Sequence, residues 1–121
     1  MVNLLFNTTQ KPNSFSSIHT QAKVVEVVLF EINPGYSKKE AEKALSSFND
    51  VIKLYYGFVE RITASNEDGR YIDIIYWSDI DSAKSSAIDI KNNKEATAIF
   101  SIIKPESIQM YHFDTFNRFE E

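Results

Sequence analysis

The 121-residue sequence contains no cysteine and only three glycines. The lack of cysteine excludes thiol nucleophiles, disulfides and thiolate metal sites. Three glycines are too few for the glycine-rich loops that hold phosphates and dinucleotides. No G-x-S-x-G motif is present either, so the nucleophile turn of the serine hydrolases is absent.

Basic stripes and long apolar runs are also missing. The net charge is −4, and the densest lysine cluster, Lys38, Lys39 and Lys43, is interrupted by Glu40 and Glu42. Nucleic-acid-binding proteins carry a basic footprint, so this class is excluded. No apolar run approaches the ~20 residues that span a bilayer, and the first residues lack the basic start of a signal peptide. These absences predict a cytoplasmic protein without a membrane partner.

The chain length fits one domain. Residues 1–22 are rich in Asn, Thr, Ser and Gln, a composition that buries little apolar surface and predicts a flexible arm. Residues 23–114 are predicted to form the domain, and the charged residues 115–121 a tail.

Residue patterns predict four strands and two helical regions. Residues 22–32 are rich in β-branched side chains and are followed by the turn residues Asn33-Pro34-Gly35, which indicates a strand. The sequence Ser37 to Glu40 is a capping box, and an apolar stripe follows it to a terminator at Gly57. The remaining patterns predict, in chain order, strands at 58–65 and 71–77 around a hairpin turn, helices over 79–103 with a break at 92–93, and a strand at 107–113.

The order βαββαβ predicts a ferredoxin-like α+β fold with a four-stranded antiparallel sheet. Its helices would cover one face only, yet both faces of the predicted strands are apolar. A second copy of the chain is the simplest cover for the other face, so we expect a homodimer through the sheet. On the third strand we assign Ile72, Ile74 and Tyr76 to the helix-covered face. The opposite set is Tyr71, Asp73, Ile75 and Trp77.

Asp73 and His112 are the candidate catalytic residues. Asp73 lies among apolar and aromatic neighbours, which disfavour an ionised carboxylate and make it a candidate general base. The alternative is an ion pair with Arg61 or Arg70. His112 is a candidate for proton transfer or ligand binding, or else a satisfied interior histidine. The other histidine lies in the predicted arm, so we predict no metal site.

Five further residues are candidates for substrate binding. Trp77 and Tyr71 would stack on a planar substrate, although packing is the alternative role for such aromatics. Tyr36 lies at the start of the first helix, where it would rim a pocket. Met110 shares the strand face of His112, and Glu26 would enter the cavity if the strand parity allows.

The strand and turn sequences resemble the antibiotic-biosynthesis-monooxygenase-like family of dimeric α/β barrels. The resemblance covers about three quarters of the chain, and it rests on residues 25–35, 57–61, 68–78, 81–84 and 108–113. It implies a pocket between sheet and helices, and members that oxidise aromatic polyketides without metal or flavin. In those members a tryptophan and an amide share the third strand; Trp77 matches the tryptophan, whereas Asp73 stands in the amide's place. No arginine matches theirs, and Lys94 is a loose substitute.

The resemblance therefore implies a cofactor-independent monooxygenase that acts on a small aromatic or planar molecule. Haem degradation is disfavoured, because the tryptophan and histidine that haem-degrading members carry on the second helix are missing from residues 79–103. Two alternatives remain open: a non-catalytic dimer that binds or senses a small molecule, and a purely structural domain whose cavity is filled by its own side chains.

Overall fold

The computed structural model describes residues 22–120, and its elements follow the predicted βαββαβ order. They are β1 (Val24–Glu31), α2 (Lys38–Ser47), α3 (Asn49–Ile52), β2 (Phe58–Ser65), β3 (Arg70–Trp77), α4 (Ile80–Ile90), α5 (Lys94–Phe100), a 3₁₀ turn (Pro105–Ser107) and β4 (Gln109–Asp114). The predicted arm lies outside the described residues, except for Ala22, which is buried. Residues 115–120 form no helix or strand.

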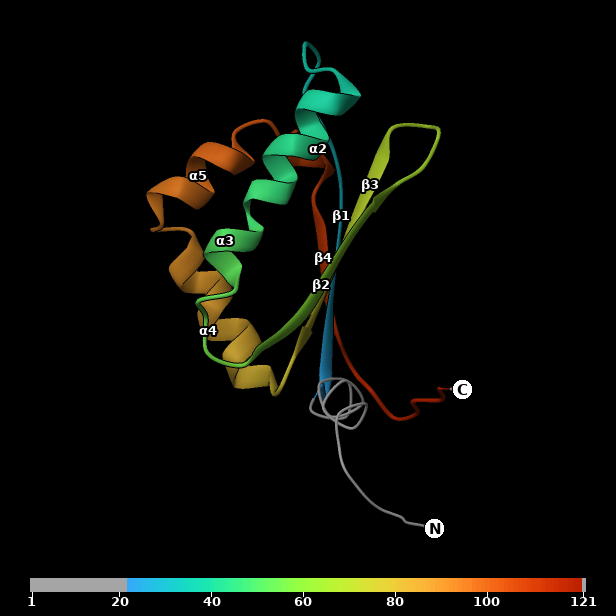
Figure 1. The fold of residues 1–121 in the computed structure, drawn as a ribbon, viewed down its shortest axis with the longest axis vertical. Helices are drawn as coiled ribbons and strands as arrows, with labels where there is room; N and C mark the ends of the chain where they lie inside the picture. Colours follow the sequence, from blue (N-terminus) through green and yellow to red (C-terminus); the bar gives the residue numbers. More distant parts are fainter. Residues whose placement is uncertain (1–21, 121) are drawn as a thin grey trace, which may run out of the picture.

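The four strands form one sheet in the order β2-β3-β1-β4, and each neighbouring pair is antiparallel. All the described helices lie on one face of this sheet, as Figure 1 shows. The ferredoxin-like fold class predicted from the sequence is therefore confirmed. None of the helices within residues 22–120 is long and apolar enough to cross a membrane.

Local capping explains where the helices begin. The Ser37 hydroxyl accepts a hydrogen bond from the Glu40 N–H, and the Glu40 carboxylate accepts one from the Ser37 N–H, which completes the predicted capping box. Asn93 caps α5 by accepting from the Ala96 N–H, so the predicted break between the last two helices is real. The first helical region, predicted as continuous, divides at Phe48 into α2 and α3.

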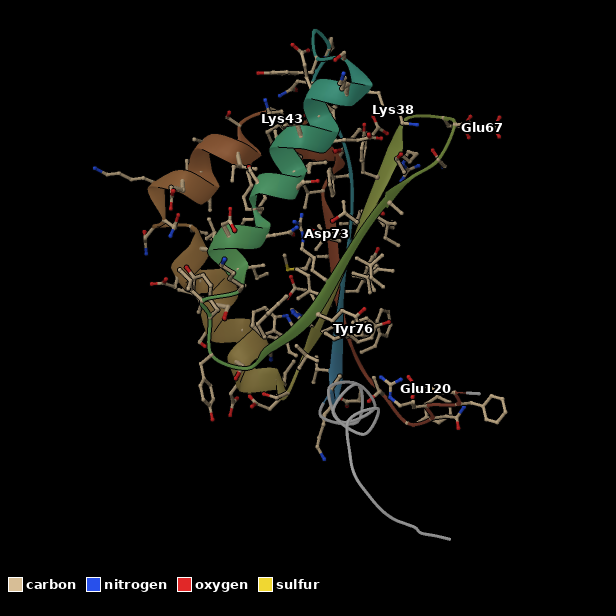
Figure 2. The ribbon with its side chains drawn as sticks, in the orientation of Figure 1. Lys38, Lys43, Glu67, Asp73, Tyr76 and Glu120 are labelled. Carbon is tan, nitrogen blue, oxygen red and sulfur yellow. The ribbon has the colours of Figure 1, made fainter. Side chains whose placement is uncertain are left out.

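The strand parity assigned from the sequence is wrong. Tyr71, Asp73, Ile75 and Trp77 face the helices and are buried, whereas Ile72, Ile74 and Tyr76 face the open side. Figure 2 shows Asp73 between sheet and helices and Tyr76 on the opposite side of the sheet. The sequence carries little parity information because both sets are apolar. In the folded chain the larger aromatic rings fill the space beneath the helices.

The core lies between the sheet and the helices in two clusters. One is built around Trp77 and Phe48, and the other around Phe30 and Leu45. The opposite sheet face is also apolar, with side chains such as Ile62 and Phe113 about half exposed. The fold thus leaves a large apolar surface that no described helix covers.

Gly57 lies directly before β2, where the backbone passes close to α4. Its φ is +86°, and a Cβ there would overlap the Ser82 side chain. Gly69, in the turn between β2 and β3, has a similar φ of +80° but open space around it. The two glycines share a backbone requirement and differ only in packing.

We therefore expect Gly57→Ala to destabilise the protein more than Gly69→Ala. Both substitutions carry a left-handed backbone cost of roughly 1–2 kcal/mol. Gly57→Ala adds a steric cost of about 1–3 kcal/mol because α4 must shift. Chemical denaturation of both variants measures the difference, and equal losses of unfolding free energy would show that the approach to Ser82 is unimportant.

Candidate functional site

A cavity of about 390 Å³ lies between the helix-facing side of the sheet and the helices. Its volume is near the lower end of the range for small-molecule sites, about 300–1,000 Å³. Most of its wall is apolar, with side chains such as Val28, Phe30, Phe48, Ile52 and Phe100. The charged members of the lining are Glu26, Asp73 and Lys91. An apolar wall with few polar groups is the usual character of a site for a small organic molecule.

Asp73 is held by a bidentate ion pair with Arg61. The Arg61 Nε donates to Oδ1 at 2.8 Å and Nη2 donates to Oδ2 at 2.9 Å. The Thr63 hydroxyl also donates to Oδ1, at 3.2 Å. The charged side chains are almost completely buried, at 3% exposure for Arg61 and 8% for Asp73. Of the partners considered from the sequence, Arg61 is therefore the one that Asp73 uses.

The same arginine ties β2 to the first helical region. Its Nη1 donates to the Leu45 carbonyl and to the Asn49 side-chain oxygen, each at 2.8 Å. Its guanidinium carbon lies 4.9 Å from the centre of the Phe48 ring, a cation–π distance. Both oxygens of Asp73 are thus engaged by one cation, which is the ion-paired alternative considered from the sequence.

Glu26 forms the second polar group of the cavity. Its carboxylate Oε1 accepts a hydrogen bond from the Trp77 indole N–H at 3.1 Å. The His112 Nε2 lies 3.1 Å from the same oxygen. Glu26 and His112 are direct cross-strand partners on β1 and β4. Three residues from three adjacent strands therefore meet at one carboxylate oxygen.

Burial raises the pKa of Glu26 above its ordinary value. The hydrogen bond and the charge interaction from His112 oppose this rise, as does the hydrogen bond from Trp77. The negative charge of Asp73 adds to it. The net result is a carboxyl group that holds its proton more strongly than an exposed glutamate does, which suits a group that exchanges protons closer to neutral pH.

The structure brings some of the predicted site residues to this cavity and places others outside it. Trp77, Glu26 and Met110 line the cavity together with Asp73, and His112 joins it through Glu26. Tyr71 is buried but is not part of this lining, and its ring stacks on that of Phe30 with the centroids 5.6 Å apart.

Tyr36 is 46% exposed and borders a separate surface depression near the hairpin, which Tyr71 also lines. Residues missed by sequence reasoning include Lys91 and the side chains of the first helical region, such as Phe48. Lys91 caps the C-terminus of α4, and only the packing of that helix over the sheet brings it to the cavity. The contact between Glu26 and His112 had a usable signal, because β1 and β4 are neighbours in this fold and the two positions pair.

Within residues 22–120 no group of three or more His, Asp or Glu side chains is arranged to hold a metal ion. The two carboxylates of the cavity are instead engaged by basic side chains, Asp73 by Arg61 and Glu26 by His112. The chemistry available to the described residues is proton transfer and hydrogen bonding in an apolar enclosure.

Solved structures similar to this chain include enzymes of oxygen chemistry. SnoaB, a cofactor-independent oxygenase from Streptomyces nogalater, matches with a TM-score of 0.66 at 19% identity, over 83% of this chain and 99% of its own. The monooxygenase ActVA-Orf6 of Streptomyces coelicolor, solved with nanaomycin D, matches with a TM-score of 0.65 at 12% identity, over 86% and 97%. A scan of family models and a search of curated proteins each found no match.

The chain has the ferredoxin-like fold of the antibiotic biosynthesis monooxygenases. A dimeric ferredoxin-like protein from an uncultured marine organism also matches, with a TM-score of 0.61 at 10% identity, over 83% of this chain and 93% of its own. The fold implied by the resemblance of the strand sequences is therefore confirmed. At these identities the likeness concerns the fold alone.

We expect Asp73→Asn to act mainly on stability. Removing one partner of a buried ion pair leaves Arg61 charged and uncompensated, which costs about 3–5 kcal/mol. Arg70→Gln is the control, since Arg70 pairs with Glu31 at 3.7 Å on the exposed surface and such pairs contribute about 0–1 kcal/mol. Urea denaturation measures both variants. A stable Asp73→Asn protein that loses ligand turnover would restore Asp73 as a catalytic base.

Proposed function

We propose that the protein is a cofactor-independent monooxygenase that acts on a small aromatic or otherwise planar organic molecule in the 390 Å³ cavity. The observation that carries this proposal is the Glu26–His112 hydrogen bond at a mostly apolar cavity with Trp77 in its wall. Such an enclosure favours a flat apolar ring system and presents it to a proton acceptor. The likeness in fold to SnoaB and ActVA-Orf6 supports the same reaction class.

The proposed reaction is direct oxygenation of a substrate anion. A base of the cavity removes a proton from the substrate, and the electron pair stays on the substrate, where the aromatic system delocalises it. The anion then reduces O₂, forming one carbon–oxygen bond, and the protonated base returns its proton to the new peroxide. Loss of water from the resulting peroxide leaves a carbonyl group, so a methylene carbon loses two hydrogens and gains one oxygen atom. Of the two bases predicted from the sequence, Asp73 has its charge compensated by Arg61. His112 lies next to the cavity, in contact with Glu26.

The protein is also proposed to be a homodimer through the open face of the sheet. This face carries apolar side chains on all four strands, and the described helices lie on the other face. Large apolar surfaces on soluble proteins mark interaction sites. Because the same face would meet itself in a two-fold dimer, one symmetric contact covers both copies. The dimeric ferredoxin-like neighbour supports this arrangement.

A second candidate function is ligand binding without turnover. The observation that favours it is the Arg61–Asp73 pair, which removes one expected base from the cavity. In this case the cavity holds a metabolite, and the dimer responds to occupancy. Saturable binding without consumption of O₂ distinguishes this function from oxygenation.

Oxygen uptake with anthrone as the test substrate examines the proposed reaction. We expect the wild-type protein to consume anthrone and O₂ in equal amounts and to release anthraquinone and water. Ala87 lines the cavity, so Ala87→Phe should lower the rate at least about tenfold by filling part of the volume. Ala98→Phe makes the same change at an exposed position of α5 and should keep the wild-type rate. Equal rates in both variants would place the reaction elsewhere.

The dimer is tested by Ile74→Asp, which puts a charge at the centre of the open face. We expect the wild-type protein to sediment as two chains and Ile74→Asp to sediment as one, because a buried unpaired carboxylate opposes association. Leu54→Asp is the control, since Leu54 is 79% exposed on the helical side. A wild-type protein that sediments as one chain at micromolar concentration would contradict the proposed interface.

A further inference from the structure

The buried carboxylate of Glu26 has one oxygen that the described contacts leave unused. Oε1 receives both Trp77 and His112, whereas Oε2 takes no hydrogen bond from any residue within 22–120. Glu26 is 5% exposed and lines the cavity. A buried carboxylate oxygen without a partner is costly, so a donor from a bound molecule would satisfy it.

His112 helps to hold the Glu26 carboxylate in this orientation. It contacts Oε1 across the β1–β4 pair, and its side chain is 22% exposed while that of Glu26 is 7% exposed. The ring therefore joins the buried carboxylate to the surface of the sheet edge. Trp77 fixes the same oxygen from the other neighbouring strand. The two contacts hold the carboxylate through Oε1 from both neighbouring strands, and neither uses Oε2.

The other charged groups that line the cavity around Glu26 are Asp73 and Lys91. Asp73, on β3, is neutralised by Arg61 from β2. Lys91 lines the cavity from the end of α4 and is exposed. The surrounding residues of α3 and α5, such as Ile52 and Phe100, are apolar. Of the two carboxylates in the lining, both oxygens of Asp73 accept hydrogen bonds, whereas only Oε1 of Glu26 has a partner within residues 22–120.

We propose that Glu26 is the catalytic proton acceptor of this site, that His112 is its positioning residue, and that the substrate carries a hydroxyl group that meets Oε2. The hydroxyl O–H bond breaks, its electron pair stays on the substrate oxygen, and the proton forms the carboxylic acid of Glu26. The resulting phenolate is the electron-rich species that the proposed oxygenation requires, so this inference rests on the proposed function. The preference for a substrate hydroxyl group depends on binding alone and does not require turnover.

The single tryptophan of the chain reports on Glu26 directly. Because burial raises the pKa of Glu26 and His112 lowers it, wild-type Trp77 fluorescence should show a transition above the ordinary range of a glutamate. Glu26→Gln should abolish this transition. His112→Asn should move it to higher pH, since the opposing influence of the histidine is lost. Glu31→Gln, an amide change on the same strand in an exposed ion pair, should leave it in place.

Ligand binding tests the free oxygen with three matched compounds: 2-hydroxyanthraquinone, 2-methoxyanthraquinone and anthraquinone. We expect the wild-type protein to bind the hydroxyl compound at least about tenfold more tightly, as a hydrogen bond to a charged group allows. In Glu26→Gln this preference should largely disappear. If Glu26→Gln does not fold, Glu26→Asp, which withdraws the carboxylate from the cavity, takes its place. An unchanged hydroxyl preference in the variant would overturn the proposal.

Kinetics separate this proposal from the proposed function. With anthrone, whose enol tautomer anthranol carries the hydroxyl group that meets Oε2, Glu26→Gln should lower kcat by about 10²–10⁴-fold. His112→Asn should shift the acidic limb of the pH–rate profile to higher pH. A wild-type rate and profile in Glu26→Gln would overturn the role of Glu26 while oxygenation stands. A wild-type protein that shows a Glu26-dependent hydroxyl preference but no oxygen uptake would refute oxygenation and support Glu26 as the binding group.

Discussion

The buried ion pair between Arg61 and Asp73 connects the parts of the fold that form the cavity. Arg61 comes from the edge strand β2, Asp73 from its neighbour β3, and the remaining guanidinium donors reach Leu45 and Asn49 in the first helical region. One side chain therefore links two strands of the sheet to the first helical region. Since an unpaired charge in this position would be very costly, the arrangement is restricted to a narrow geometry.

That restriction also assigns different roles to two carboxylates in one cavity. Asp73 has a permanent cation on both oxygens, so its charge is compensated whether or not a ligand is bound. Glu26 has neutral or titratable partners on one oxygen only. Desolvation therefore acts on Glu26 without full compensation, and its pKa rises. Environment, rather than residue type, therefore gives the two carboxylates different partners and different compensation of their charge.

Much of the fold was predictable because its signals are local. The capping box at Ser37 and Glu40 and the helix break at Asn93 depend on residues a few positions apart. The strands around Gly69 were likewise marked by their turn and composition. The candidate site was less predictable, since Asp73 and Glu26 resemble each other in sequence: each is an acid within an apolar strand. Only the partners of each acid distinguish them, and those partners lie on other strands.

By itself the sequence determined the order of elements, the ferredoxin-like class and the presence of a second apolar sheet face, because periodicity and turn chemistry are properties of neighbouring residues. The tertiary structure decided which face of β3 lies beneath the helices, since both faces are apolar and only packing volume separates them. It also decided that Arg61 forms an ion pair with Asp73 and that Glu26 forms hydrogen bonds with His112 and Trp77. These pairings join residues 12 to 86 positions apart, and a distance of that kind is set by strand register rather than by local sequence.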